Sequence, residues 1–155
     1  MSTVGEVSSE FVFEARVTVA PPMIITAGPK GLRRVIPILG GVFEGPRIRG
    51  TVLEGGADWQ YVRPDDVVSL EARYTLQVDD GTLIMVINRG MRHGPPAVLE
   101  RIFRGEAVDP SEYYFRTVAE FEAPAGPHDW LNKAIFLGVA RRTVTEAIVR
   151  LHQVL

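Results

Sequence analysis

The sequence predicts an all-β fold, a sandwich or a closed barrel, with about eight short strands and one short helix. Two observations predict it: apolar and polar residues alternate in short segments along the chain, and Gly and Pro residues separate these segments. The chain has 155 residues, of which 46% are hydrophobic and 23% charged, and this suits one domain with a substantial core. We expect residues 1–10 to form a flexible N-terminal tail and residues 11–155 to form the single domain.

The first half of the domain predicts several short strands. From Phe11 to Val19 apolar residues occupy every second position, which is typical of a half-buried strand, and Pro21-Pro22 ends it. Further strands are predicted in the apolar segment 35–39, across 42–53 with an irregularity at Gly45-Pro46, and over 58–62.

Residues 66–92 predict one long β-hairpin, because Asp80-Gly81 is a short-turn signature between two alternating segments. A two-residue loop pairs Tyr74 with Ile87 and places Arg89 at the end of the apolar face that carries Tyr74. A guanidinium keeps its charge when buried, so it needs an anionic partner or a water-filled cavity. The hairpin therefore predicts a sheet around a small wet pocket. A three-residue loop would instead move the pairing by one residue and put Arg89 on the other face.

The second half predicts the helix and the last strands. Pro95-Pro96 suits the start of a helix over 95–103, and Gly105 suits its end. Residues 113–121 alternate again, with Tyr113 and Phe115 on the inward face. Residues 134–140 form a nearly continuous apolar strand, and the β-branched residues of 143–151 favour a strand there.

Composition argues against several classes of protein. The net charge is -2 and no basic stripe is present, which argues against nucleic acid as a partner. The sequence has no cysteine, no P-loop and no nucleophile elbow, and its three histidines lack metal-ligand spacing. We therefore expect no metal and no cofactor. Without a signal peptide or an apolar run of membrane length, we expect a cytoplasmic protein that does not bind membranes.

Two groups of polar residues are candidates for chemistry. In the segment GGADWQ (55–60), Asp58 is a candidate general base, and Trp59 is a candidate apolar wall that raises its pKa. The alternative is that Asp58 caps the turn and Trp59 fills the core. Tyr74 and Arg89 are candidates for holding a carboxylate, enolate or phenolate oxygen. The alternative is a salt bridge that Arg89 makes at the barrel end.

Aromatic and amide side chains complete the candidate site. Tyr113 is a candidate ligand donor beside Phe115, and aromatic core packing is the alternative. In DWLN (129–132), Trp130 is a candidate for the mouth of the pocket or an oligomer contact. Asn132 is a candidate ligand-binding amide, and the alternative is that it closes a turn.

Five segments together resemble one family. They are GGVFEGPRIRG (40–50), GGADWQ (55–60), ARYTLQVDDG (72–81), PSEYYFRT (110–117) and WLNKAIFLGVARR (130–142). They are similar to the bacterial and fungal family called domain of unknown function 3237. The resemblance implies a single antiparallel calycin- or lipocalin-like β-barrel of about eight or more strands with one short helix, often a homodimer. It implies no assigned activity, although similar small barrels include lipid-binding carriers and cofactor-free cyclases.

The leading hypothesis is a cofactor-independent enzyme of the isomerase, cyclase or lyase type. Its substrate is expected to be a small apolar or aromatic metabolite bound in the barrel. Asp58 is the predicted acid/base, and Arg89 and Tyr74 hold the oxyanion or carboxylate. The predicted substrate-binding residues are Trp59, Tyr113, Phe115, Trp130 and Asn132. The alternatives are a non-catalytic carrier of such a molecule and an interaction module whose barrel is packed solid.

Overall fold

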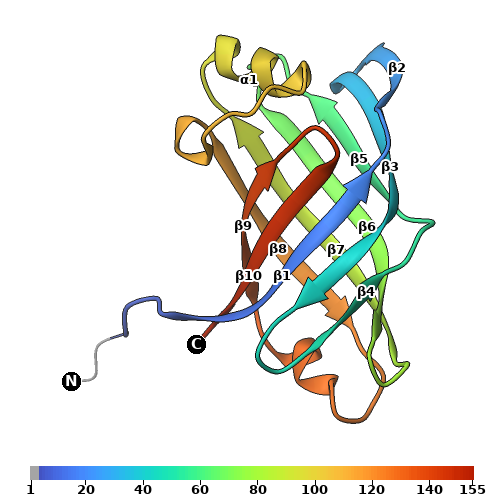
Figure 1. Cartoon of the computed structure of the whole chain (residues 1–155). Helices are drawn as coiled ribbons and strands as arrows, with labels where there is room; N and C mark the ends of the chain where they lie inside the picture. Colours follow the sequence, from blue (N-terminus) through green and yellow to red (C-terminus); the bar gives the residue numbers. More distant parts are fainter. Residues whose placement is uncertain (1–3) are drawn as a thin grey trace.

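The computed structural model, which describes residues 4–155, is built around a closed antiparallel β-barrel (Figure 1). It confirms the predicted all-β barrel with one short helix. Within residues 4–155 the elements are β1 (Ser9–Val19), β2 (Met23–Gly28), β3 (Gly31–Glu44), β4 (Arg49–Val52), β5 (Ala57–Val62), β6 (Val68–Val78), β7 (Leu83–His93), α1 (Pro96–Phe103), β8 (Tyr114–Glu122), β9 (Phe136–Arg142) and β10 (Glu146–Val154), with short 3-10 helices η1 (Pro110–Glu112) and η2 (Asp129–Lys133). Residues 1–3 of the predicted tail lie outside the described residues.

Strand β1 closes the barrel, because it pairs with β10 on one side and with β3 on the other. From β10 the wall continues in order through β9, β8, β7 and β6. Between β6 and β3 two short strands share one position: β4 pairs with one end of β3 and β5 with the other. The described chain thus forms an eight-stranded barrel with two extra strands. One is extra because β4 and β5 together fill a single position of the wall, and the other is β2, which pairs with one end of β3.

Aromatic side chains fill the end of the barrel next to η2. Phe13 on β1 packs against Phe43 on β3 and Phe121 on β8, with ring centroids 5.1 and 6.1 Å apart. Phe121 packs in turn against Phe136 at 5.0 Å. Burying each such ring stabilises the fold by roughly 1.5–3 kcal/mol. This half of the barrel is therefore a solid core, and any space for a ligand lies toward the other end.

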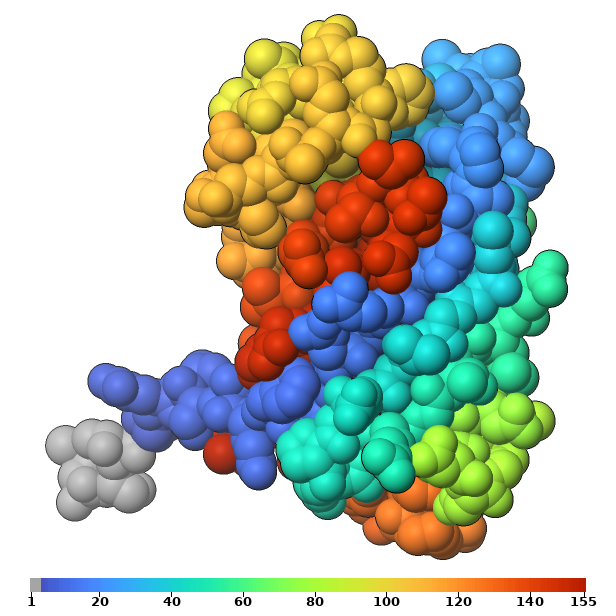
Figure 2. Space-filling view, in the orientation of Figure 1, coloured from blue at the N-terminus to red at the C-terminus, as the bar shows by residue number. Residues whose placement is uncertain are grey.

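Helix α1 lies at the opposite end of the barrel (Figure 1). Pro96 occupies its first turn, where a missing N–H costs nothing, and Val98 and Ile102 are its buried residues. In the space-filling view the segment around α1, in yellow and gold, covers this end (Figure 2). The structure thus confirms the helix predicted over 95–103. Within residues 4–155, no helix is long and apolar enough to cross a membrane.

The hairpin β6–β7 forms as predicted, but its register differs by one residue. Tyr74 pairs with Val86, and Glu71 pairs with Arg89. The N–H of Val78 donates to the carbonyl of Thr82, which closes a three-residue loop whose last residue, Gly81, has φ +90°. Three-residue loops with glycine in this left-handed conformation are a common hairpin class. The predicted two-residue loop is therefore wrong.

Candidate functional site

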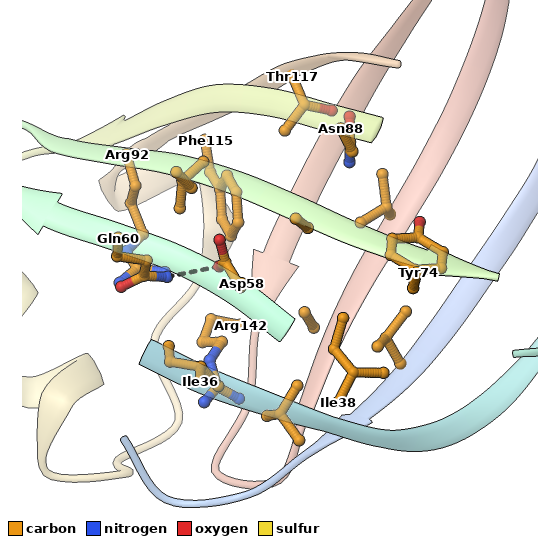
Figure 3. Close-up of a pocket in the computed structure, with 16 residues that line it drawn as sticks. Ile36, Ile38, Asp58, Gln60, Tyr74, Asn88, Arg92, Phe115, Thr117 and Arg142 are labelled. Carbon is orange, nitrogen blue, oxygen red and sulfur yellow. Dashed lines mark hydrogen bonds between the residues drawn. The ribbon is translucent and has the colours of Figure 1, made fainter. Parts of the chain in front are cut away.

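A cavity lies inside the barrel on the α1 side of the aromatic core (Figure 3), and we call it the inner cavity. About 50 Å³ of it is open to the centre of a water molecule. This is room for roughly three or four waters or for one end of a small ligand. Its walls are mainly Val, Ile, Leu and Ala side chains of β1, β3, β6 and β10. Its polar lining residues are Asp58, Gln60, Tyr74, Asn88, Arg92, Thr117 and Arg142.

Four residues of the inner cavity carry a buried polar atom that has no hydrogen-bond partner. The atoms are Asp58 Oδ1, Asn88 Oδ1, Arg92 Nη1 and Thr117 Oγ1, and within residues 4–155 they are the buried side-chain atoms of this kind. Leaving such a group unpaired costs about 1–3 kcal/mol, so most buried polar groups in proteins are paired. Gathering all four around one cavity is the arrangement expected of a preformed binding site, where a ligand supplies the missing partners.

A hydrogen-bonded chain fixes the carboxylate of Asp58. Gln60 Nε2 donates to Asp58 Oδ2 at 2.7 Å, and Arg34 Nε donates to Gln60 Oε1 at 2.8 Å. Figure 3 shows the Gln60–Asp58 bond beside the cavity. Asp58 and Gln60 are two residues apart on β5, so both side chains point into the barrel. These hydrogen bonds therefore hold Oδ2 of Asp58 in place and leave its Oδ1 free for a ligand.

Burial also sets the protonation of the acidic groups. It raises the pKa of Asp58, against the lowering effects of the Gln60 hydrogen bond and the charge of Arg92. A carboxyl whose pKa rises toward neutrality exchanges protons more effectively near neutral pH. Burial, together with the charge of Asp58, raises the pKa of Tyr74 as well, so its phenol stays protonated and remains a hydrogen-bond donor.

Two arginines face the inner cavity. Burial lowers the pKa of Arg92 to about 10, and the neighbouring charge of Arg34 acts in the same direction. Arg92 is still cationic at neutral pH, and its guanidinium lies 5.2 Å from the ring centroid of Phe115. Arg142 Nη1 donates to the backbone carbonyls of Thr143 and Glu146 at 2.8 and 3.1 Å, which fixes its position at the β9–β10 turn.

A second cavity, which we call the outer chamber, lies between the inner cavity and α1. It shares Val19, Ile36, Arg92 and Arg142 with the inner cavity, so the two are adjacent. Its remaining walls include Ile102 and Phe103 of α1, and about 310 Å³ of it is open to the centre of a water molecule. This volume is in the range of small-molecule sites. The inner cavity alone is well below that range.

The structure brings four of the predicted site residues together. Asp58, Tyr74 and Phe115 line the inner cavity. Tyr113 is buried and lines neither cavity, but its hydroxyl accepts a hydrogen bond at 3.1 Å from the backbone N–H of Arg142, which lines both. The alternation of residues 66–78 and 113–121 predicted the inward faces of Tyr74, Tyr113 and Phe115, whereas Asp58 was a candidate from the segment GGADWQ.

Two predicted residues lie outside the barrel. Arg89 is half exposed, and its Nε donates to Glu71 Oε1 at 2.6 Å on the outer surface. Its predicted inward position is wrong because the hairpin loop has three residues. Trp59 is 46% exposed, because it follows Asp58 directly on β5 and successive side chains point to opposite faces. Neither the apolar wall beside Asp58 nor the core filling predicted for Trp59 is present.

Trp130 and Asn132 lie on η2, at the aromatic end of the barrel and away from both cavities. Trp130 packs against Phe136, and the guanidinium of Arg47 lies 3.7 Å from the centroid of its ring. The Asn132 amide accepts from the N–H of Ala123 and donates to its carbonyl, both at 2.8 Å. The pocket-mouth position predicted for Trp130 is therefore wrong, and the amide of Asn132 has the turn-closing role of the alternative in place of the predicted ligand contact.

Several cavity residues were not singled out from the sequence, namely Arg34, Gln60, Asn88, Arg92, Thr117 and Arg142. A three-residue loop would have placed Asn88 and Arg92 inside, since both share the face of Val86. Gln60 is two residues from Asp58 on one strand. Within residues 4–155, no three His, Asp or Glu side chains gather as a metal site requires.

Sequence and structure comparisons find uncharacterised bacterial relatives. The UPF0311 protein RPA1785 of Rhodopseudomonas palustris is 45% identical over 125 residues, which cover 81% of this chain and 82% of the relative. Its crystal structure has a TM-score of 0.92 at 37% identity, covering 99% of this chain and 100% of that chain. A UPF0311 protein of Clostridium acetobutylicum is 36% identical over 155 residues, covering 99% of this chain and 98% of the relative.

A more distant relative is a fungal enzyme. The hydroalkoxylation enzyme phnH of Penicillium herquei is 31% identical over 77 residues, covering 50% of this chain and 51% of the enzyme. The crystal structure of an enzyme from Penicillium herquei has a TM-score of 0.74 at 21% identity, covering 100% of this chain and 99% of that chain, and this likeness shows a shared fold. Residues 7–154 match the family described as "Protein of unknown function (DUF3237)". The chain therefore belongs to this family, DUF3237.

Proposed function

We propose that this protein is a cofactor-independent enzyme of the isomerase, cyclase or lyase type that acts on a small, partly apolar molecule bound in the barrel, with its reacting end in the inner cavity. The observation that carries the proposal is the group of four buried, unpaired polar atoms around a cavity with apolar walls. One of them belongs to an acid and one to a cation, which are the two groups that proton transfer next to a developing oxyanion requires.

Each residue has a role that follows from its surroundings. Asp58 is the acid/base, since burial raises its pKa and its Oδ1 is free. Arg92, rather than Arg89, holds the oxyanion through its unpaired Nη1. Tyr74 supplies a neutral phenol as a second donor, and Phe115 forms an apolar wall.

Addition of an alcohol across a carbon–carbon double bond fits these groups. It is the chemistry that the name of the distant fungal relative describes. The alcohol O–H and the alkene π bond break, while a C–O and a C–H bond form. Asp58 takes the alcohol proton and delivers a proton to the neighbouring carbon. Where the alkene is conjugated to a carbonyl, charge builds on the carbonyl oxygen, to which Arg92 donates. The step balances without an oxidant or a reductant.

The test uses small α,β-unsaturated ketones that carry a hydroxyl group, with 2′-hydroxychalcone as the reference compound. Cyclisation is followed by loss of the enone absorbance and by chiral chromatography of the product. We expect the wild type to give one enantiomer in excess. Asp58→Asn and Arg92→Gln should each lower kcat/KM by about 100-fold or more. Arg89→Gln is the control, which should keep wild-type turnover because Arg89 lies outside the barrel.

Two results would contradict the proposal. One is an Asp58→Asn variant that turns over as fast as the wild type. The other is tight binding of the compounds followed by their recovery unchanged in mass and retention time. The second result would assign the barrel to the carrier alternative.

A further inference from the structure

The outer chamber has an unbalanced positive charge. Its lining contains four arginines, Arg34, Arg92, Arg104 and Arg142, and no Asp or Glu from residues 4–155. The whole chain has a net charge of -2, so this charge is local to the chamber. Apolar side chains, among them Ile36 and Ile102, make up much of the remaining wall, so the charges lie in a partly dehydrated space.

One of these arginines is neutralised on the surface. Arg104 Nη1 lies 2.9 Å from Glu100 Oε1, and its Nη2 lies 2.8 Å from Glu106 Oε2. The hydrogen bonds that the other arginines of the chamber make go to neutral groups: Arg34 donates to Gln60, and Arg142 donates to backbone carbonyls.

The single carboxylate of Asp58, whose charge acts on all three remaining arginines, does not balance them. Asp58 lies in the inner cavity, and Arg34 reaches it only through Gln60. Arg34 and Arg92 are 7% and 6% exposed, so water compensates their charges little. Burial lowers the pKa of Arg34 and Arg142, and the charge of Asp58 raises both without cancelling that effect, while the charge of Arg34 lowers the pKa of Arg142 further. An anion in the chamber would relieve this repulsion.

We propose that the substrate carries a carboxylate, which binds to Arg34 and Arg142 in the outer chamber while its apolar part reaches into the inner cavity beside Asp58. The inference rests on the proposed function and names its substrate class. A guanidinium presents its N–H groups in a planar fork that matches a carboxylate, and apolar chamber walls suit an organic acid. Arg92 lines both cavities and remains free for the reacting oxygen.

Binding of 3-phenylpropionate and of its primary amide tests this directly. The two compounds have the same shape and differ in charge, and calorimetry at neutral pH measures both affinities on the full chain. We expect the carboxylate to bind at least about tenfold more tightly than the amide. In Arg142→Gln and Arg34→Gln this preference should fall below about threefold. Arg104→Gln is the matched control within the same chamber and should keep the preference, because Arg104 is already ion-paired.

Several results would overturn the inference: equal binding of acid and amide, no binding of the acid at about 10 mM, or tighter binding of the corresponding phosphonate. The last would assign the chamber to phosphorylated metabolites. Asp58→Asn separates this inference from the proposed function, since it should remove turnover and keep the charge preference. A preserved preference with undiminished turnover in Asp58→Asn would reject the catalytic role and leave the carboxylate site standing.

Discussion

Asp58 is held in the barrel interior by Gln60, with one oxygen bound and the other unpaired. Burial raises its pKa above the unfolded value, so the folded chain binds this proton more tightly than the unfolded chain. This group therefore contributes most to the free energy of unfolding at low pH, below its unfolded pKa. That contribution is lost as the pH rises through the folded pKa. At the residue scale, the carboxyl of Asp58, which is the proposed catalytic group, therefore lowers the stability of the fold at neutral pH.

Asp58→Asn should make the protein more stable at neutral pH, because it removes the buried charge. The gain should appear as the pH rises above the ordinary Asp value of about 3.9 and should vanish below it. At this chain length each kcal/mol corresponds to a rise in Tm of about 2–4 °C. Thermal unfolding of both proteins between about pH 4 and 8 measures the effect. Asp79→Asn serves as the control, because Asp79 is exposed and its surface ion pair with Arg49 contributes little to stability. A variant that is less stable than the wild type at neutral pH would show that Asp58 is not strained by burial.

At the scale of elements, one residue in a loop decides which side chains enter the barrel. The alternation of 66–92 predicted both strands and the place of the turn between them, but Asp80-Gly81 is compatible with loops of either length, and the predicted length was wrong. Side chains on a strand repeat every two residues, so a shift of one residue exchanges the two faces of β7. Asn88 and Arg92 therefore face the cavity, while Arg89 meets Glu71 outside.

Close strand packing beside the cavity depends on Gly138 of β9. A Cβ atom there would lie 2.0 Å from Thr117 Oγ1 and 3.1 Å from Val149 Cγ1. Gly138→Ala should push Thr117 out of place and destabilise the protein by about 1–3 kcal/mol. Urea unfolding measures this loss. Gly28→Ala is the control, since a Cβ atom added at Gly28 would meet nothing within 4 Å, and it should be close to neutral. Equal stability of the two variants would mean that the strands around Thr117 yield easily.

At the scale of the whole molecule, the two ends of the barrel differ in what fills them. Phenylalanines pack the η2 end, while the α1 end holds the two adjacent cavities and their arginines. Arg34, Asp58, Arg92 and Arg142 come from four different strands, β3, β5, β7 and β9. Their convergence depends on strand order and register, and one sequence without its fold does not contain that information.

The sequence alone predicted most of the strands, the helix and the inward positions of Tyr74 and Phe115, because each depends on local pattern. Strand β2 was not predicted, and Asp58 was a candidate from its turn segment. It did not distinguish a barrel from a sandwich, and the family resemblance supplied that choice. The homodimer that this resemblance implies stays a prediction. Val118 and Leu137 are exposed apolar residues that pair on the outer faces of β8 and β9, and such a surface is compatible with a homodimer.

The measurement that tests the central claim most directly is a crystal structure of the protein with bound 3-phenylpropionate. The account predicts density for the phenyl ring in the inner cavity, in contact with Phe115 and next to Asp58, and carboxylate oxygens within hydrogen-bond distance of Arg34 and Arg142. An inner cavity closed by rearranged side chains, with the compound bound elsewhere or absent, would contradict the account.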